Sequence, residues 1–187
     1  MIVSKNELMN KSIELFKTHG YENVTVPMIC QQFGVTKGSF YHHFKSKNDL
    51  LLQWMVKEYS IIESGYYHDN SLSEYENFRN KQMIWAKFLE FLDRDLSFAT
   101  LKIMIQYLNA PEQFSKFEIS SLRSLDVDYV KKLQSQGIIS SLYKAEELIR
   151  IYSEMVVGAT IEWQTKNNDY NILERIEFIF DFVYKKR

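Results

Sequence analysis

The stretch "GVTKGSFYHHFKSK", residues 34–47, places a tyrosine and two histidines side by side as Tyr41, His42 and His43. Imidazole is a common metal ligand and a general acid or base near neutral pH. Adjacent residues of a helix diverge by about 100°, so the two imidazole rings cannot converge on one ion. No partner ligand lies near them in the sequence. We therefore expect no metal site here and interpret His43 as a packed or half-buried ring, with His42 facing outward beside Tyr41.

No other residue pattern indicates an enzyme. The sequence contains no nucleophile–base motif, no metal-ligand spacing and no phosphate-binding loop. Glu154 and Glu162 are interpreted as solvated carboxylates at the edges of the apolar face of a helix. The single cysteine, Cys30, excludes a disulfide framework within the chain and is interpreted as a small core residue, with a redox sensor as the alternative. We predict that the protein is not an enzyme and needs no metal or cofactor, with an enzyme acting on an apolar substrate as the alternative.

The same stretch suits contact with a phosphate backbone. On a helical wheel Phe40 and Phe44 fall within about 40° of each other and must face the core. The opposite face carries no acidic residue and consists of Gly38, Tyr41, His42 and Lys45. Free backbone amides at the helix start add donors for an anion. Whether Lys45 reaches a phosphate or is only solvated stays open at this point.

Helices separated by glycines are expected to position this face. The apolar spacing predicts helices at residues 4–19, 26–33, 37–44 and 46–64. Ser4, Thr25 and Thr36 are the expected N-caps, and Gly34 makes the turn of a helix-turn-helix candidate. The first 50 residues contain six lysines against four acidic residues, whereas the whole chain has a net charge of -1. Positive charge therefore gathers near this unit, as expected for a segment that meets a polyanion.

The remaining sequence, from about residue 72, reads as helices with no convincing pair of strands. Its middle helices carry aromatic and methionine side chains that suit an apolar ligand pocket. The candidate pocket residues are Trp85, Phe88, Met104, Tyr107, Phe114, Phe117, Tyr129, Met155 and Trp163. The alternative is that they form an ordinary core, since aromatic stripes at helical spacing usually do.

The last two predicted helices are apolar over most of their circumference, so each must cover a core on one side and something else on the other. We expect two such helices from each subunit to pack as a four-helix bundle in a homodimer. The candidate interface residues are Ile151, Met155, Gly158, Ile172, Ile176, Ile179, Phe180 and Val183. A helix pair wrapped entirely within the monomer is the alternative.

Residues from about 6 to 52 resemble the DNA-binding domain of the TetR family of bacterial transcriptional repressors. The matching pieces are "SIELFKTHGYENVTV" and "ICQQFGVTKGSFYHHFKSKNDLL", with their spacing. The resemblance implies an all-α fold, with a three-helix helix-turn-helix DNA-binding domain at residues 1–46. The fourth helix would join it to a larger helical effector-binding and dimerisation domain at residues 47–187. Pro27 and Met28 replace the acidic or polar residues common in the family, which puts in doubt how the second helix meets DNA.

The resemblance also implies DNA contacts, at Thr25, Thr36, Lys37, Gly38, Ser39, Tyr41, His42 and Lys47. Lys47 resembles a clamp on the DNA backbone. The implied function is a sequence-specific repressor that binds a near-palindromic DNA operator as a homodimer and is released by a small, largely apolar effector. The alternative is a DNA-binding protein of the same fold without a small-molecule effector, controlled by a protein partner or organising the chromosome.

The start "MIVSKNELMN" lacks the continuous apolar core of a secretory signal. No run approaches the roughly 18 apolar residues that indicate a membrane-spanning helix. Together with the single cysteine, these features lead us to expect a cytoplasmic protein without a membrane partner.

Overall fold

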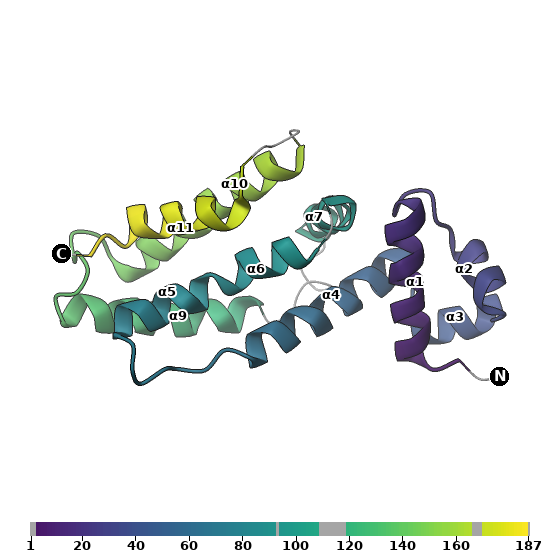
Figure 1. Ribbon diagram of the computed structural model, residues 1–187, viewed down its shortest axis with the longest axis horizontal. Helices are drawn as coiled ribbons and strands as arrows, with labels where there is room; N and C mark the ends of the chain where they lie inside the picture. Colours follow the sequence, from purple (N-terminus) through teal and green to yellow (C-terminus); the bar gives the residue numbers. More distant parts are fainter. Residues whose placement is uncertain (1–2, 93, 109–118, 166–169, 187) are drawn as a thin grey trace. The chain divides into compact units, whose positions relative to one another are not determined.

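The computed structural model describes residues 3–92, 94–108, 119–165 and 170–186 (Figure 1). Within these ranges the regular structure is helical, apart from an isolated antiparallel bridge between Ile139 and Lys186. The helices are α1 (Lys5–His19), α2 (Val26–Phe33), α3 (Lys37–His43), α4 (Lys47–Ser64), α5 (Glu74–Gln82), α6 (Ile84–Phe91), α7 (Arg94–Leu108), α9 (Ile119–Ser135), α10 (Ala145–Thr165) and α11 (Ile172–Val183). The predicted all-α fold is confirmed. None of the described helices is both long and apolar enough to cross a membrane.

The described helices fall into two compact units. The first contains α1, α2, α3, α7 and α4 as far as Ile61, and the second contains α5, α6, α9, α10 and α11. The first unit runs to Ile61 within α4, so it continues past residue 46, where the sequence placed the domain boundary. That boundary stays a prediction.

Local hydrogen bonds determine where the first three helices begin. The side chains of Ser4, Thr25 and Thr36 each accept a bond from the backbone N–H three residues later, at 3.2, 3.4 and 3.0 Å. Gly34 follows α2 in the left-handed conformation, with φ of 64°, which residues with a Cβ rarely adopt. The predicted N-caps and turn glycine are confirmed, so short-range interactions determine where α3 starts.

A small apolar core holds these helices together. Phe16, Ile29, Phe40 and Phe44 are almost completely buried, and the rings of Phe40 and Phe44 lie 5.7 Å apart between centroids. Cys30 is 7% exposed, and burial raises the pKa of its thiol. Cys30 is therefore a small core residue, as expected from the sequence, and its thiol stays protonated at neutral pH.

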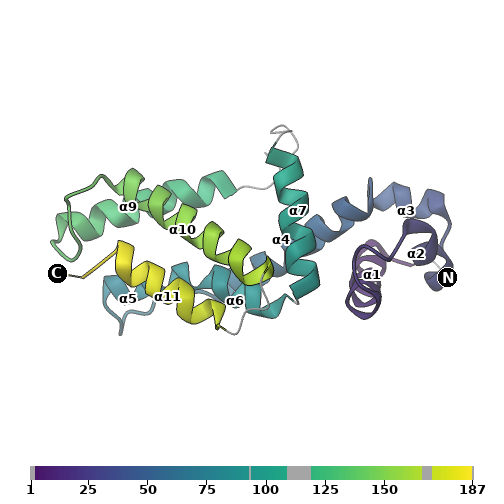
Figure 2. The ribbon, with the colours of Figure 1, turned by 90° about the horizontal axis from the view of Figure 1, so that it is seen from above.

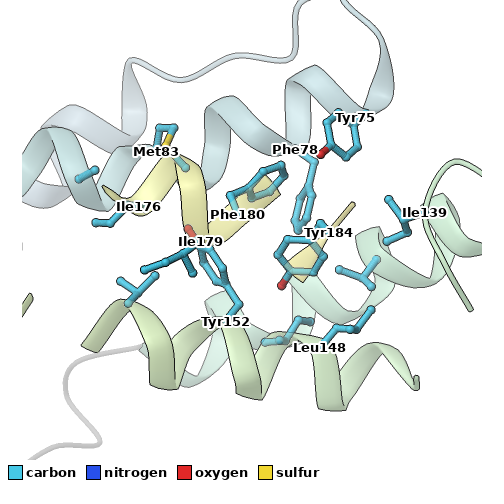
Figure 3. Close-up of a cluster of buried hydrophobic side chains, with 14 of the residues drawn as sticks. Tyr75, Phe78, Met83, Ile139, Leu148, Tyr152, Ile176, Ile179, Phe180 and Tyr184 are labelled. Atoms are coloured by element: carbon cyan, nitrogen blue, oxygen red, sulfur yellow. The ribbon is translucent and has the colours of Figure 1, made fainter. Parts of the chain in front are cut away.

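Aromatic rings fill the core of the second unit, where α11 packs against α10 and α6 (Figure 2). The Phe180 ring lies among four others, with centroid distances of 5.5 Å to Tyr75, 5.5 Å to Phe78, 6.1 Å to Tyr152 and 5.0 Å to Tyr184 (Figure 3). Burial raises the pKa of the Tyr184 hydroxyl, which keeps this ring neutral. Close packing of these rings fixes the rotation of α11 about its own axis.

The rotation of α11 corrects the predicted dimer interface. Four of the residues assigned to that interface lie inside the chain's own core, each at most 2% exposed: Ile172, Ile176, Ile179 and Phe180. Their assignment to a subunit surface is wrong, because the rest of the second unit already covers this stripe. The exposed aromatic residues of α11 are Phe178 and Phe182. Of the other candidates, Gly158 is exposed and the partly buried ones are Ile151, Met155 and Val183.

Candidate nucleic-acid interface

α3 turns one face to the core and the other to solvent. Tyr41 is 54% exposed, and His42 is exposed as well. His43 is half-buried, with its ring centroid 6.2 Å from that of Phe44. In the part of the chain that the structure describes, no group of three or more His, Cys, Asp or Glu residues could hold a metal ion. The two histidines therefore differ in surroundings: His42 lies on the surface, and His43 is partly packed beside Phe44.

The beginning of α3 is an open surface. Lys37 and Gly38 are exposed, and the Thr36 hydroxyl caps the helix. A Cβ added at Gly38 would meet only the Thr36 Oγ1 atom, at 3.7 Å, which is an ordinary contact. The backbone at Gly38 does not have a positive φ. Neither packing nor backbone conformation within the protein requires glycine here, and its absent side chain lets another molecule approach the helix closely.

The beginning of α2 is also exposed. Thr25 caps this helix, and Pro27 occupies its first turn, where a missing N–H is tolerated. Met28 is 41% exposed, so the departure from the usual family sequence lies on the surface. The first turn contains no acidic residue. An anion approaching Thr25 would meet no opposing charge from α2.

Lys5 adds a positive charge near α3 that was not predicted from the sequence. Its ammonium lies 5.5 Å from the centroid of the Phe44 ring, within cation–π distance. Lys45 is exposed, and its backbone N–H donates to the Asp49 carboxylate at 2.7 Å. No local sequence signal joins the first turn of α1 to the end of α3, so only the tertiary fold could reveal Lys5 here.

Lys47 differs from the other predicted DNA contacts because its ammonium has acceptors within the protein. The Nζ atom donates to the backbone oxygens of Tyr21 at 2.7 Å and Val24 at 2.9 Å. It also lies 4.1 Å from the centroid of the Tyr21 ring. Burial lowers the pKa of Lys47, while the nearby Glu22 carboxylate acts in the opposite direction.

The residues predicted to line a ligand pocket are only partly described. Phe114 and Phe117, together with the side chains of Met104 and Tyr107, lie outside the described residues. Phe88 is fully buried. The other four pack partly buried against the core of the second unit: Trp85, Tyr129, Met155 and Trp163. These contacts agree with an ordinary core and with one wall of a pocket, so the ligand site stays a prediction.

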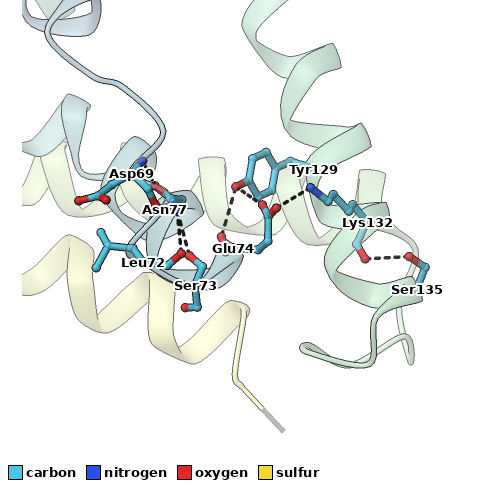
Figure 4. Close-up of polar contacts among 8 residues, drawn as sticks. All are labelled: Asp69, Leu72, Ser73, Glu74, Asn77, Tyr129, Lys132 and Ser135. Atoms are coloured by element: carbon cyan, nitrogen blue, oxygen red, sulfur yellow. Dashed lines mark hydrogen bonds and ion pairs between the residues drawn. The ribbon is translucent and has the colours of Figure 1, made fainter.

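Tyr129 already has hydrogen-bonding partners within the protein (Figure 4). Its hydroxyl donates to the Glu74 carboxylate at 2.7 Å, and Lys132 donates to the other oxygen of that carboxylate at 2.6 Å. Burial, followed by the hydrogen bond to Glu74, raises the pKa of Tyr129. A ligand that bonded to this hydroxyl would have to compete with Glu74.

Comparison with known proteins identifies the first segment. Residues 8–53 match the family model described as bacterial regulatory proteins, tetR family. An HTH-type transcriptional regulator of Bacillus subtilis, YerO, is 33% identical over 100 residues, which is 48% of this chain and 32% of YerO. The biofilm operon icaADBC negative regulator IcaR of Staphylococcus aureus is 24% identical over 131 residues, which is 69% of this chain and 67% of IcaR. The match to YerO thus spans about a third of that protein's length.

Solved structures with a similar fold cover almost the whole chain. The Thermus thermophilus TetR-family repressor FadR, in complex with lauroyl-CoA, has a TM-score of 0.71 at 18% identity, covering 96% of this chain and 93% of that one. FadR of Bacillus halodurans has a TM-score of 0.68 at 14% identity, covering 98% and 97%. At these identities the likeness shows the fold alone.

The relatives and solved structures named above are all described as regulators, in agreement with the prediction that this protein is not an enzyme. The family match covers the α1–α3 segment, where a capped helix, a glycine turn and an outward-facing tyrosine were predicted from the sequence and are present in the structure. Residues 8–53 thus match the tetR family of bacterial regulatory proteins, and the chain as a whole is similar to transcriptional regulators of that family.

Proposed function

We propose that this protein is a sequence-specific DNA-binding transcriptional regulator that acts in the cytoplasm as a repressor. The observation that carries the proposal is the outward face of α3, where Tyr41 is 54% exposed beside the open backbone at Gly38. A short, exposed helix of this kind fits the major groove, where side chains read base edges. The family match at residues 8–53 supports the same use of α3.

The residues of this face divide by chemistry into two groups. Lys37, Gly38 and Ser39 lie at the start of α3, where recognition helices contact base edges. Contacts to phosphates place a protein on DNA without reading sequence, and hydroxyl groups supply many of them. We assign this second role to the hydroxyls of Thr25, Thr36 and Tyr41 and to the imidazole of His42. The His42 imidazole would reach a nearby base as well.

Homodimerisation is part of the proposal. One seven-residue recognition helix offers few base contacts, and a twofold pair would read both halves of a near-palindrome about 34–36 Å apart. The exposed rings of Phe178 and Phe182 support self-association, because they give the C-terminal helix an uncovered apolar face. This face replaces the buried stripe that was predicted from the sequence to form the interface.

The remaining part of the proposed function is release of the protein from DNA by a small, largely apolar effector. One structure that shares the fold, the Thermus thermophilus repressor, was solved with lauroyl-CoA, a ligand with a long apolar chain. The partly buried aromatic residues around the core of the second unit, such as Trp85 and Trp163, supply apolar contacts of the same kind. An effector of this type must bind the form with low DNA affinity more tightly than the other form.

A regulator without a small-molecule effector is the second candidate. It is favoured by the engagement of Tyr129 with Glu74, since a filled core leaves fewer polar groups to orient a ligand. The two candidates differ in one measurement. Apolar acyl ligands added to the protein–operator complex should release DNA in the first case and have no effect in the second.

Selection of bound duplexes from a random pool tests the main proposal. The expected result is a short near-palindrome with half-sites about one helical turn apart. Enrichment of a single unrepeated site would contradict the twofold arrangement. Recovery of no preferred sequence would contradict sequence-specific DNA binding itself.

A further inference from the structure

Lys47 lies at the start of α4, but its ammonium is directed into the loop between α1 and α2. An ammonium group has three donors and no acceptor. Two of them are used by the backbone oxygens of Tyr21 and Val24, at 2.7 and 2.9 Å, and the Tyr21 ring lies 4.1 Å away. The acceptors precede Lys47 by 26 and 23 residues, so this contact joins separate parts of the first unit.

The bond to Val24 has a direct consequence for Thr25. A peptide unit is planar, so the Val24 carbonyl and the Thr25 N–H lie in one rigid plane. By holding that carbonyl, Lys47 fixes the orientation of the peptide at which α2 begins. Thr25 then caps α2 through its side chain, which accepts from the Met28 N–H.

Other contacts hold the same loop. The Tyr21 hydroxyl donates to the Asn48 side chain at 2.6 Å, next to Lys47 in α4. Glu22 pairs with Lys102 of α7 at 2.5 Å. Val24 is completely buried and Tyr21 is 5% exposed. The loop is therefore fixed by its packing and by bonds from two helices, and Lys47 contributes two of those bonds.

We propose that Lys47 is a positioning residue, whose ammonium holds the loop from Tyr21 to Thr25, and with it the start of α2, in the conformation that meets the DNA backbone. It would act on DNA through Thr25 rather than by contacting a phosphate itself. A phosphate contact would require the ammonium to leave both backbone oxygens, and the abandoned acceptors would lose charge-assisted hydrogen bonds. This inference rests on the proposed function of DNA binding.

The salt dependence of operator binding separates the two roles. Lys47→Met retains the aliphatic stem and removes the donors. We expect operator affinity to fall roughly tenfold, as for loss of the one hydrogen bond from Thr25 to a charged phosphate, with folding confirmed by circular dichroism. The slope of log affinity against log salt concentration should equal that of the wild type. A lysine on a phosphate would instead reduce the slope by roughly 0.9 per protomer.

A double-mutant cycle with Thr25→Ala provides a second readout. If Lys47 acts through Thr25, Thr25→Ala should weaken binding in the wild type and have little further effect in the Lys47→Met background. Additive losses with a reduced salt slope would overturn the proposal, as would wild-type affinity in Lys47→Met. Lys131→Met, an exposed lysine of the second unit, is the matched control for loss of one charge.

Tyr21→Phe keeps the proposal testable if Lys47→Met does not fold. It removes the hydrogen bond to Asn48 and leaves every charge in place. A weaker operator affinity with an unchanged salt slope would support loop positioning, and unaltered affinity in a folded Tyr21→Phe protein would contradict it. If the wild-type protein selects no duplex at all, the proposed function fails, and that failure is distinct from the failure of this inference.

Discussion

The rings of Phe178 and Phe182 stack on the outer face of α11, with centroids 6.4 Å apart and planes inclined by 16°. Phe178 and Phe182 are 58% and 65% exposed, whereas the intervening Phe180 is fully buried. An exposed aromatic pair next to a completed core is typical of a surface that another molecule covers. We expect that molecule to be a second copy of the chain.

Phe178→Glu and Phe182→Glu should each weaken self-association. A charge placed in an apolar interface costs at least about 2 kcal/mol, so the dimer dissociation constant should rise by roughly 30-fold or more. Sedimentation at micromolar concentration measures this change. Leu142→Glu is the control, because Leu142 is 77% exposed in the turn before α10. A wild-type chain that sediments as a monomer would refute the interface.

Phe180→Ala should destabilise the folded chain, while Phe182→Ala should not. Truncating a buried phenylalanine costs about 3–5 kcal/mol in lost transfer and cavity energy, and an exposed one changes stability by within about 0.5 kcal/mol. Urea unfolding measures both changes. The comparison belongs in a Phe178→Glu background, so that dimerisation does not contribute. Equal effects at the two positions would show that α11 is rotated differently.

Lys37→Ala should change which sequences the protein prefers. At the start of α3 this side chain is expected to contact a base edge, and loss of one such contact costs about 1–3 kcal/mol at that base pair. Repeating the duplex selection with the variant should relax one position in each half-site. An unchanged preference would remove Lys37 from base reading, and Ser39→Ala then becomes the next variant to compare.

Tyr41→Phe should weaken all duplexes by a similar factor. The hydroxyl is expected to bond to a phosphate, so its removal should cost about 1 kcal/mol without favouring any sequence. Affinities for the selected operator and for a scrambled duplex provide the test. A loss confined to the operator would mean that Tyr41 reads bases rather than phosphates.

Glu74→Gln should make stability less sensitive to acid. Hydrogen bonds from Lys132 and then Tyr129 lower the pKa of the Glu74 carboxyl in the folded chain. Because the carboxyl has a lower pKa in the folded chain than in the unfolded chain, where it is about 4.3, its ionised form stabilises the fold at any pH above the unfolded-state pKa. This contribution is lost as the pH falls through the folded-state pKa. The wild type should therefore exceed the variant in unfolding free energy at neutral pH, and the difference should shrink on acidification. A difference that is independent of pH would contradict this ionic contribution.

The parts of the candidate site that could be predicted from sequence depend on neighbours close along the chain. Thr36 caps α3 by bonding to the N–H of Ser39, and Gly34 takes a left-handed conformation that its own lack of a Cβ permits. The outward direction of Tyr41 follows from helical periodicity once Phe40 is buried. These interactions span a few residues, so their sequence signals are direct.

The sequence by itself therefore determined the helices, the turn before α3 and the outward face of that helix. The tertiary structure alone decided which apolar stripe of α11 is covered, and it decided where the Lys47 ammonium binds. A helical pattern can show that Phe180 and Phe182 are both apolar, but not which one the other helices cover. Likewise, the acceptors of Lys47 lie more than 20 residues earlier in the chain, and only folding brings them within hydrogen-bonding distance.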